Sequence, residues 1–301
     1  MNIAFLGLGV MGNPVCANLL DQGDFSIRVY DIDPGKAEKL VVSGARLATS
    51  TREAVAGCEL VMTSLPGPKQ IEAAALGENG FLADMDAGST WIDLSTNNLE
   101  VCRKITERCQ ALNIGFLDCP VSGGDEGAAA GSLTILAGGS EDLFRHWLPV
   151  LEVIGGNIQH VGPGGAGYSA KIAQVVLCYL HSLALSEALM LGISGGVEPD
   201  QMLDIIRNST GSSYVADRYG PPILNGDYDP SFTVGLAHKD MQLAEEMAAN
   251  LGITLPMCNL TTGTYARAIE SYGFDANHLK AVRLLEEENS TFLRSRHASG
   301  L

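Results

Sequence analysis

Paired cysteines of the kind that form a disulfide framework or bind a zinc ion are missing from this chain. The sequence has seven cysteines, an odd number, scattered between positions 16 and 258 without a C-x-x-C pair. Disulfide frameworks and structural zinc sites depend on closely spaced cysteine pairs. The histidines also lack metal-ligand spacing. We therefore expect no metal site, and we interpret the cysteines as small core residues in a reducing compartment.

Basic residues are scarce as well. Nineteen lysines and arginines stand against 35 acidic residues, which leaves a formal net charge of -16 at pH 7. A chain with this charge repels nucleic acid and anionic membranes, and it has no basic tract to overcome the repulsion. The composition therefore argues against nucleic acid and membrane as partners.

From the sequence we expect neither a leader peptide nor a membrane span. Met1 leads directly into an apolar run, which leaves no room for a signal peptide, and we find no apolar run of the roughly 18 residues that a span requires. The expected location is the cytoplasm. At 301 residues the chain is long enough for two domains.

The most informative feature that is present lies in the first twelve residues, MNIAFLGLGVMG. An apolar strand at residues 3–6 runs directly into a Gly-x-Gly-x-x-Gly turn, and a helical run at 14–20 follows. In dinucleotide-binding folds the first glycine allows the tight turn, the second lets the pyrophosphate approach, and the third lets helix and strand pack closely. The predicted cofactor cradle comprises Gly7, Leu8, Gly9, Val10, Met11 and Gly12.

The next predicted strand ends in Asp31, 19 residues beyond Gly12. A carboxylate at this point of the fold accepts hydrogen bonds from the adenosine ribose and repels a 2′-phosphate, so the sequence favours NAD over NADP. Lys36 leaves some use of NADP open. The alternative is that Asp31 and Asp33 only form a turn before Pro34.

The first half of the chain alternates short apolar runs with helical stretches, as in a parallel sheet. Further runs lie at 60–65, 90–94, 115–118 and 133–137. Such sheets bind ligands at the carboxyl ends of their strands, so we expect Leu65, Pro66 and Thr96 to contact the cofactor. They are equally consistent with ordinary turns.

A glycine cluster at residues 162–165 separates this half from a region that is predicted to be helical. A long helix is expected at 166–192, with others at 199–208, 236–251, 256–272 and 278–293, and only the tail 295–301 is expected to be disordered. The predicted domains are 1–163, which binds the dinucleotide, and 164–301, which is all-helical. Because the long helix is apolar on nearly all sides, it also predicts a homodimer or homotetramer.

Lys171 lies about two turns inside this long helix. Burial and a nearby helix N-terminus both lower the pKa of a lysine toward the range useful in acid-base catalysis. From the helix alone, a lysine whose amine reaches the surface is an equally good interpretation.

Four motifs in order resemble those of the β-hydroxyacid dehydrogenase family, which contains 3-hydroxyisobutyrate dehydrogenase and tartronate semialdehyde reductase. They are Phe5–Pro14, Phe116–Gly124 with Gly127–Thr134, Gly164–Lys171, and Phe232 with Ala237–Asp240. The resemblance covers nearly the whole chain. It implies an α/β fold class, with an N-terminal Rossmann-like dinucleotide-binding domain and an all-α C-terminal domain joined by a long interdomain helix.

The resemblance also implies roles for individual residues. Lys171 becomes the general acid/base, which is sufficient without a metal because a single proton moves as hydride passes to NAD. The turn Ser122, Gly123 and Gly124 becomes the site for the carboxylate of a small β-hydroxyacid, and a plain β-turn is the alternative. Phe232 and Lys239 belong to the segment that reaches toward the cofactor.

Two positions depart from the family pattern. The family usually has asparagine four residues after the catalytic lysine, where this chain has Val175, and Gln174 points about 100° away around the helix. Asp125 and Glu126 follow the substrate turn, where relatives are generally less acidic. Asp125 could therefore receive the ammonium group of a 3-hydroxy amino acid such as a serine derivative, unless both acids only face solvent.

Two other functions remain as alternatives. Imine reductases share this architecture, but they generally lack the lysine found here at Lys171 and prefer NADPH. A non-catalytic dinucleotide-binding protein is disfavoured by Lys171, Ser122 and Lys239, although Val175 leaves it open. Tyr214, Tyr219 and Phe232, around a stretch predicted to be rich in loops, either close over the substrate or pack the helical core.

Overall fold

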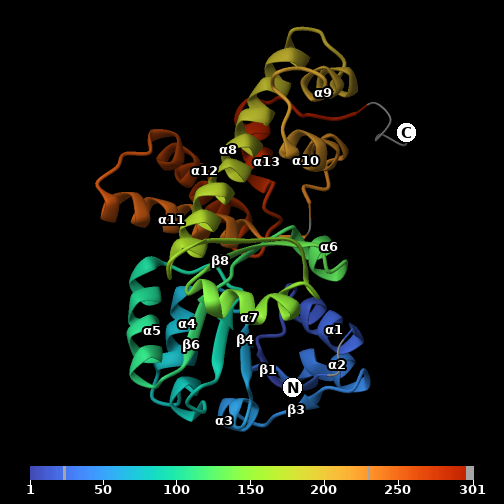
Figure 1. The fold of residues 1–301 in the computed structure, drawn as a ribbon. Helices are drawn as coiled ribbons and strands as arrows, with labels where there is room; N and C mark the ends of the chain where they lie inside the picture. The colour runs from blue at the N-terminus through green and yellow to red at the C-terminus, as the bar shows by residue number, and fades with distance from the viewer. Residues whose placement is uncertain (23–24, 230, 296–301) are drawn as a thin grey trace. The chain divides into compact units, whose positions relative to one another are not determined.

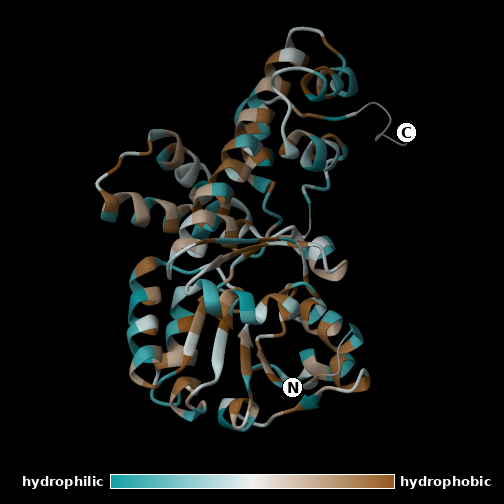
Figure 2. Ribbon diagram, viewed as in Figure 1, coloured by the Kyte–Doolittle hydropathy of each residue, from teal (hydrophilic) through white to brown (hydrophobic). Residues whose placement is uncertain are grey.

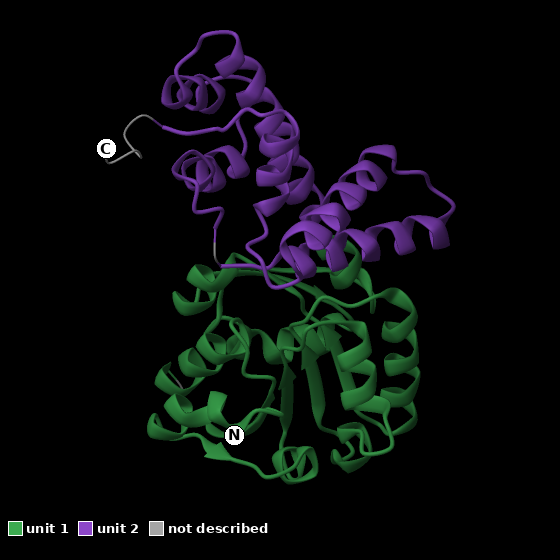
Figure 3. Ribbon diagram, turned by 180° about the vertical axis from the view of Figure 1, so that it is seen from behind, with its two compact units in different colours: residues 1–171 green, residues 172–301 purple. Residues whose placement is uncertain are grey.

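The structure is a computed structural model that describes residues 1–22, 25–229 and 231–295. The chain divides into two compact units, Met1–Lys171 and Ile172–Leu301 (Figures 1 and 3). The units meet inside helix α8 (Ala166–Ser194), because the first turns of this helix bond to strands of the first unit. The domain boundary at 163/164, just before this helix, stays a prediction.

The first unit contains a nine-stranded sheet in the order β3-β2-β1-β4-β5-β6-β8-β7, with β9 beside β8. The strands are β1 (Asn2–Leu6), β2 (Ser26–Tyr30), β3 (Arg46–Leu47), β4 (Leu60–Thr63), β5 (Thr90–Asp93), β6 (Gly115–Asp118), β7 (Val121–Ser122), β8 (Leu133–Gly138) and β9 (Gly155–Gly162). All six predicted apolar runs form strands, and β1, β2, β4, β5 and β6 are parallel. The predicted α/β fold class is confirmed.

The sheet is parallel from β2 to β6, as predicted, and becomes mixed beyond β6. Strand β8 pairs antiparallel with both β6 and β7. The link of residues 123–132 between β7 and β8 is shorter than the dozen or more residues that a parallel crossover needs. Strands β3, β7 and β9 were not predicted, because β3 and β7 have only two residues each and β9 is largely polar and exposed.

Helices cover both faces of this sheet. They are α1 (Gly12–Gln22), α2 (Glu38–Val42), α3 (Thr51–Val55), α4 (Pro68–Leu76), α5 (Leu99–Ala111), α6 (Gly124–Ala129) and α7 (Glu141–Leu151), with short 3-10 turns at Pro34–Ala37 and Phe81–Asp84. Strand β1 shows the alternation that separates the two cores, since Ile3 and Phe5 pack with α1, α2, α6 and α7, whereas Ala4 and Leu6 pack with α3, α4 and α5. Hydrophilic and hydrophobic segments alternate along these helices in Figure 2, as expected of helices with one buried face.

The second unit is helical. Besides most of α8 it contains α9 (Pro199–Arg207), α10 (Tyr214–Asn225), α11 (Val234–Leu251), α12 (Pro256–Tyr272) and α13 (Lys280–Glu288). Helix α8 supplies Ile172 and Tyr179 to one apolar core, and Leu185 and Leu189 to another.

Helix α8 corrects the expectation that no stretch could span a membrane. By length and composition it is apolar enough, with a mean hydropathy of 1.6 over an 18-residue window, of which 39% is buried. Core helices of globular proteins pass the same test, and α8 forms the centre of both apolar cores of the second unit. This packing accounts for the buried part of the window.

Residues 209–213 form a loop, as predicted, and helix α10 begins directly after them at Tyr214. It contains Pro221 and Pro222, but Ser213 caps its first turn by accepting a hydrogen bond from the Ala216 amide, and Val215 and Ile223 are buried. Tertiary burial therefore overrides the low helix propensity of proline.

The end of the chain also differs from the prediction. Helix α13 is shorter than the expected 278–293. Ser295 is buried, its hydroxyl donates to Asp200 at 2.6 Å, and its amide donates to the Leu224 carbonyl. The predicted disorder is therefore wrong at Ser295, and residues 296–301 lie outside the described residues.

A buried histidine in the second unit leads to a prediction about acid stability. His278 Nε2 lies 3.1 Å from Asp229 Oδ2, and burial lowers the pKa of His278 below its ordinary value, although Asp229 opposes this shift and Arg218 adds to it. Between that lowered pKa and about 6.5, the unfolded chain binds more protons than the folded one. The free energy of unfolding should therefore decrease by up to about 1 kcal/mol per pH unit as the pH falls through this window.

Urea unfolding at pH 7 and pH 5 checks this prediction. The variant His278→Gln should show a smaller loss of stability between the two values than the wild type does. His146→Gln, which changes an exposed histidine of α7, should leave the loss unchanged. Equal losses in the wild type and His278→Gln would contradict the prediction.

Candidate cofactor and substrate site

The glycine turn after β1 has the geometry of a phosphate cradle. Gly7 has φ +92°, and a Cβ built there would lie 2.3 Å from the Ser64 carbonyl oxygen. A Cβ at Gly12 would lie 2.0 Å from the Gly7 carbonyl oxygen, whereas one at Gly9 would meet no atom within 4 Å. The protein itself therefore requires the first and third glycines, and the second leaves open space of the kind that an approaching pyrophosphate needs.

Asp31 connects the end of β2 to this turn. Its Oδ2 accepts from the Leu8 amide at 2.7 Å, and its Oδ1 accepts from the Asp33 amide at 2.9 Å and lies 3.4 Å from Lys36 Nζ. Asp33 instead caps the following 3-10 turn by accepting from the Gly35 amide. The two acids thus have different roles, since Asp33 forms the turn and Asp31 lies against the glycine loop. Ile32, which the sequence analysis did not single out, is 91% exposed beside them.

The carboxyl ends of β4 and β5 lie along the same edge of the sheet. The Leu65 amide donates to Ser95 Oγ at 2.8 Å, and a Cβ at Gly7 would lie 2.9 Å from Leu65 Cδ2. Thr96 is half-buried and Pro66 is exposed. The predicted cofactor residues of the first unit therefore follow the ends of β1, β2, β4 and β5.

Beneath this edge lies a buried polar network that the sequence analysis missed. Asp93 Oδ1 accepts from the hydroxyls of Thr63 and Ser95, both at 2.6 Å, and Asp93 Oδ2 accepts from the Tyr168 hydroxyl at 2.5 Å. The Trp91 indole N–H donates to Thr63 Oγ1. Burial raises the pKa of Asp93, although these hydrogen bonds oppose the shift. The only sequence signal was an acid at the end of the apolar strand Thr90–Asp93.

The predicted substrate turn follows β7. Gly123 has φ +133° and Gly124 has φ +66°, conformations that favour glycine. Asp125 is half-buried and Glu126 is exposed, and both lie in the first turn of α6, where the helix dipole stabilises negative charge. Their position therefore agrees with both interpretations of these acids, as a cation site or as a solvated helix start.

Lys171 is half-buried in the second turn of α8, at the end of the first unit. The predicted site residues beyond Lys171 belong to the second unit. Val175 is 7% exposed and packs in an apolar core with Ile172 and Tyr179, whereas Gln174 is exposed. Position 175 therefore supplies packing to the second unit.

The remaining second-unit residues lie in and before α11. Phe232 packs against the core that contains Val175. Lys239 Nζ lies 2.9 Å from Asp240 Oδ1, and this buried carboxylate also accepts from the Tyr179 hydroxyl at 2.9 Å. Of the aromatic residues, Tyr214 is 66% exposed, and the Tyr219 ring lies 4.8 Å from the His278 ring.

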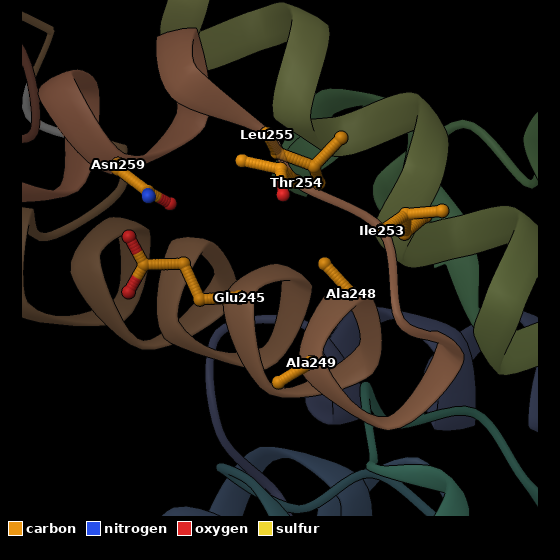
Figure 4. Close-up of a pocket in the computed structure, with 7 residues that line it drawn as sticks. All are labelled: Glu245, Ala248, Ala249, Ile253, Thr254, Leu255 and Asn259. Carbon is orange, nitrogen blue, oxygen red and sulfur yellow. The ribbon is translucent and has the colours of Figure 1, made fainter.

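A separate pocket of about 500 Å³ lies between α11 and α12 (Figure 4). It is lined by Glu245, Ala248, Ala249, Ile253, Thr254, Leu255 and Asn259. None of the predicted site residues lines it. Among the described residues, no group of three or more His, Cys, Asp or Glu side chains could bind a metal ion.

Comparisons with known proteins cover both halves of the chain. Residues 2–162 match the family model described as the NAD binding domain of 6-phosphogluconate dehydrogenase. Residues 165–285 match the model described as NAD-binding of NADP-dependent 3-hydroxyisobutyrate dehydrogenase.

Individual relatives align over nearly their full length. The chain is 36% identical to 2-(hydroxymethyl)glutarate dehydrogenase of Eubacterium barkeri, over 87% of each chain. It is 34% identical to NAD-dependent L-serine dehydrogenase of Pseudomonas aeruginosa, over 94% of this chain and 97% of the relative. A solved structure of Mycobacterium tuberculosis 3-hydroxyisobutyrate dehydrogenase with L-serine has a TM-score of 0.87 and 32% identity, and covers 94% of this chain and 98% of that one.

Proposed function

The chain belongs to the β-hydroxyacid dehydrogenase family, and we propose that it oxidises a small 3-hydroxyacid with NAD, using Lys171 as the general acid/base. Its relatives are dehydrogenases and reductases that act on the CH–OH group of hydroxyacids, so the chain is a dinucleotide-dependent oxidoreductase. The observation that carries the proposal is the open space at Gly9, in the glycine loop that Asp31 contacts through the Leu8 amide. The chain also has Lys171 at the position of the family's catalytic lysine.

In the proposed reaction, Lys171 Nζ accepts the hydroxyl proton of the substrate. NAD, when bound, would supply the acceptor for the hydride of the carbinol carbon, so that loss of the proton and the hydride converts the carbon–oxygen single bond into a carbonyl. In the reverse direction Lys171 returns the proton to the forming alkoxide. Ser122, Gly123 and Gly124 bind the substrate carboxylate through a hydroxyl and backbone amides.

The preference for NAD over NADP is part of the proposal. The Asp31 carboxylate lies against the Leu8 amide at the glycine loop, where a 2′-phosphate would meet its negative charge. Lys36 Nζ, 3.4 Å away, offsets part of that charge. We therefore expect NAD to be used more efficiently, with measurable use of NADP. Phe232 and Lys239 are proposed to contact the cofactor, as the family pattern implies.

Two substrate types are consistent with the relatives. The relatives include an L-serine dehydrogenase and a 3-hydroxyisobutyrate dehydrogenase of Pseudomonas aeruginosa. We favour a 3-hydroxy amino acid, because Asp125 follows the proposed carboxylate turn directly and its half-buried carboxylate can receive an ammonium group. Val175 stands where the family usually places its substrate-binding asparagine, and Gln174, one position earlier, points about 100° away around the helix.

The variant Asp125→Asn tests this choice of substrate. It removes the charge that would pair with the ammonium group, so we expect the ratio of kcat/KM for L-serine to that for 3-hydroxyisobutyrate to fall about tenfold. Glu126→Gln, which changes the exposed neighbour, serves as the matched control. An unchanged ratio in Asp125→Asn would show that Asp125 only faces solvent.

The first experiment on the function is absorbance at the reduced-nicotinamide band with a panel of β-hydroxyacids, offered with NAD⁺ and separately with NADP⁺. Turnover with NAD⁺ supports the proposal. NADH binding without turnover of any β-hydroxyacid would instead favour an unusual substrate or a non-catalytic dinucleotide-binding protein, an alternative that the replacement of the family's asparagine by Val175 leaves open. Lys171 argues against an imine reductase.

We also propose that the protein is a cytoplasmic homodimer or homotetramer that assembles through its second unit. Leu177 and Leu191 of α8 and Met257 and Leu260 of α12 are each more than half exposed. Apolar side chains of this size are commonly covered by a neighbouring subunit. A monomer mass in solution scattering at micromolar concentration would refute the assembly.

A further inference from the structure

We propose that Asp118 is the positioning residue of Lys171, because its carboxylate caps the N-terminus of α8 and holds the turns on which the lysine lies. The inference rests on the proposed role of Lys171 as general acid/base. All the contacts that carry it lie within the first unit, Met1–Lys171.

Helix α8 has no N-cap residue of its own. The residues that lead into it, Gly162-Pro-Gly-Gly-Ala-Gly167, contain no serine, threonine, aspartate or asparagine that could accept from its first amides. Asp118, at the end of β6, accepts instead, with Oδ1 2.8 Å from the Gly165 amide and Oδ2 3.0 Å from the Tyr168 amide. A carboxylate 47 residues away in sequence therefore caps this helix.

Two glycines let the carboxylate and the helix approach each other. A Cβ at Gly138 would lie 2.6 Å from both Asp118 carboxylate oxygens and 2.7 Å from the Gly167 amide. A Cβ at Gly167 would lie 2.4 Å from the Asp118 carbonyl oxygen and 2.3 Å from that of Leu136. The first turn of α8 thus rests directly on the ends of β6 and β8.

A second carboxylate holds the same turn from the side. The hydroxyl of Tyr168, which is fully buried, donates to Asp93 Oδ2 at 2.5 Å. Tyr168 and Lys171 are three residues apart, about one helical turn. Asp118 holds the backbone of Tyr168, and Asp93 holds its side chain. These two contacts restrict rotation and sliding of the first turn of α8, and Lys171 lies on the next turn.

The pKa of Asp118 makes its proposed role measurable through the pH dependence of the reaction. Burial raises the pKa of Asp118 to about 6, although hydrogen bonds from the Gly165 and Tyr168 amides oppose the shift. Asp118 helps to raise the pKa of Cys102 on α5, of Cys119 and of Tyr168, and Asp93 on β5 acts on the same three groups. Protonation near pH 6 removes the negative charge that favours the helix N-terminus.

The test is Asp118→Asn, measured in the reduction direction with NADH. The variant keeps one oxygen and places an NH₂ donor where the other oxygen accepts, so either the Gly165 or the Tyr168 amide loses its acceptor. We expect kcat to fall about 100-fold, the scale of a misplacement of about 1 Å, with KM and NADH binding within about twofold of the wild type. Reduction is chosen because Lys171 then acts as an acid and stays protonated at low pH. A fall of kcat near pH 6 in the wild type, absent from the variant, therefore reports Asp118.

A matched control separates positioning from stability. The Ser140 hydroxyl caps α7 by accepting from the Leu143 amide. Ser140→Ala removes this cap and should lower the melting temperature without changing kcat or its pH profile. An Asp118→Asn enzyme that folds and matches the wild type in kcat and pH profile would overturn the inference. If Asp118→Asn does not fold, Tyr168→Phe decides, because it removes only the hydroxyl that bonds Asp93. A roughly tenfold lower kcat then supports the inference, and an unchanged kcat overturns it.

Lys171→Ala, assayed in parallel, distinguishes this inference from the proposed function. If Lys171→Ala stays active, the proposed role of Lys171 as general acid/base is wrong, and Asp118 then has no catalytic group to position. If Lys171→Ala is inactive while Asp118→Asn behaves as the wild type, only the positioning role fails.

Discussion

Replacing Lys171 with alanine is expected to lower kcat/KM by about 100- to 10,000-fold, the usual contribution of a positioned acid/base. The methyl group of alanine can neither accept the hydroxyl proton nor return it, so the barrier to hydride transfer rises in both directions. Binding of NADH should persist, because the glycine loop and Asp31 are untouched. Stopped-flow or steady-state absorbance with the best substrate of the panel measures the loss, and fluorescence titration measures NADH binding.

The matched control for this variant is Lys104→Ala. Lys104 lies on α5 of the same unit and pairs with Glu72 at 2.9 Å and Glu100 at 3.0 Å. Such half-exposed ion pairs contribute little to stability, so its kcat/KM should stay within about twofold of the wild type. A Lys171→Ala enzyme that keeps more than a tenth of the wild-type kcat/KM would contradict the assignment of the base.

Replacing Gly9 with valine is expected to weaken NADH binding about 100-fold, or about 2.7 kcal/mol, while the protein still folds. A Cβ at Gly9 would meet no protein atom within 4 Å, and its φ lies outside the left-handed region. The side chain therefore enters only the space that the pyrophosphate is proposed to use. Calorimetric titration with NADH and a thermal melt together measure the two effects.

The contrasting variant is Gly12→Ala. Its methyl group would lie 2.0 Å from the Gly7 carbonyl oxygen, so the loop itself must shift. We expect this variant to lose both melting temperature and NADH affinity, whereas Gly9→Val loses affinity alone. Unchanged NADH binding in Gly9→Val would show that the dinucleotide does not pass over this glycine.

The cofactor-binding part of the site could be predicted from the sequence because its residues lie close together along the chain. A strand, a glycine turn and a helix follow one another within 20 residues. In a parallel sheet the acid after the next strand lies at the same edge as this glycine turn. The apolar runs predicted the strands for the same reason, since buried strands need continuous apolar side chains. The helices 166–192 and 256–272 were predicted within two residues of their bounds.

Other features depended on contacts between distant residues. The direction of β8, the pairing of the polar strand β9 and the helical state of residues 214–225 each result from packing or hydrogen bonds that no local pattern encodes. Val175 is a substitution in the family motif when read from the sequence, and a core residue of the second unit in the structure.

The sequence by itself determined that this chain is a two-part dinucleotide-dependent enzyme and which lysine to examine, because glycine turns, strand periodicity and motif order are written in neighbouring residues. Only the tertiary structure decided what holds that lysine in place. Asp118 and Asp93 reach α8 across 47 and 75 residues of sequence, and a buried carboxylate finds its donors through the fold. Hydrogen bonds of this kind leave no periodic signal, since each depends on where two strand ends and one helix start meet in space.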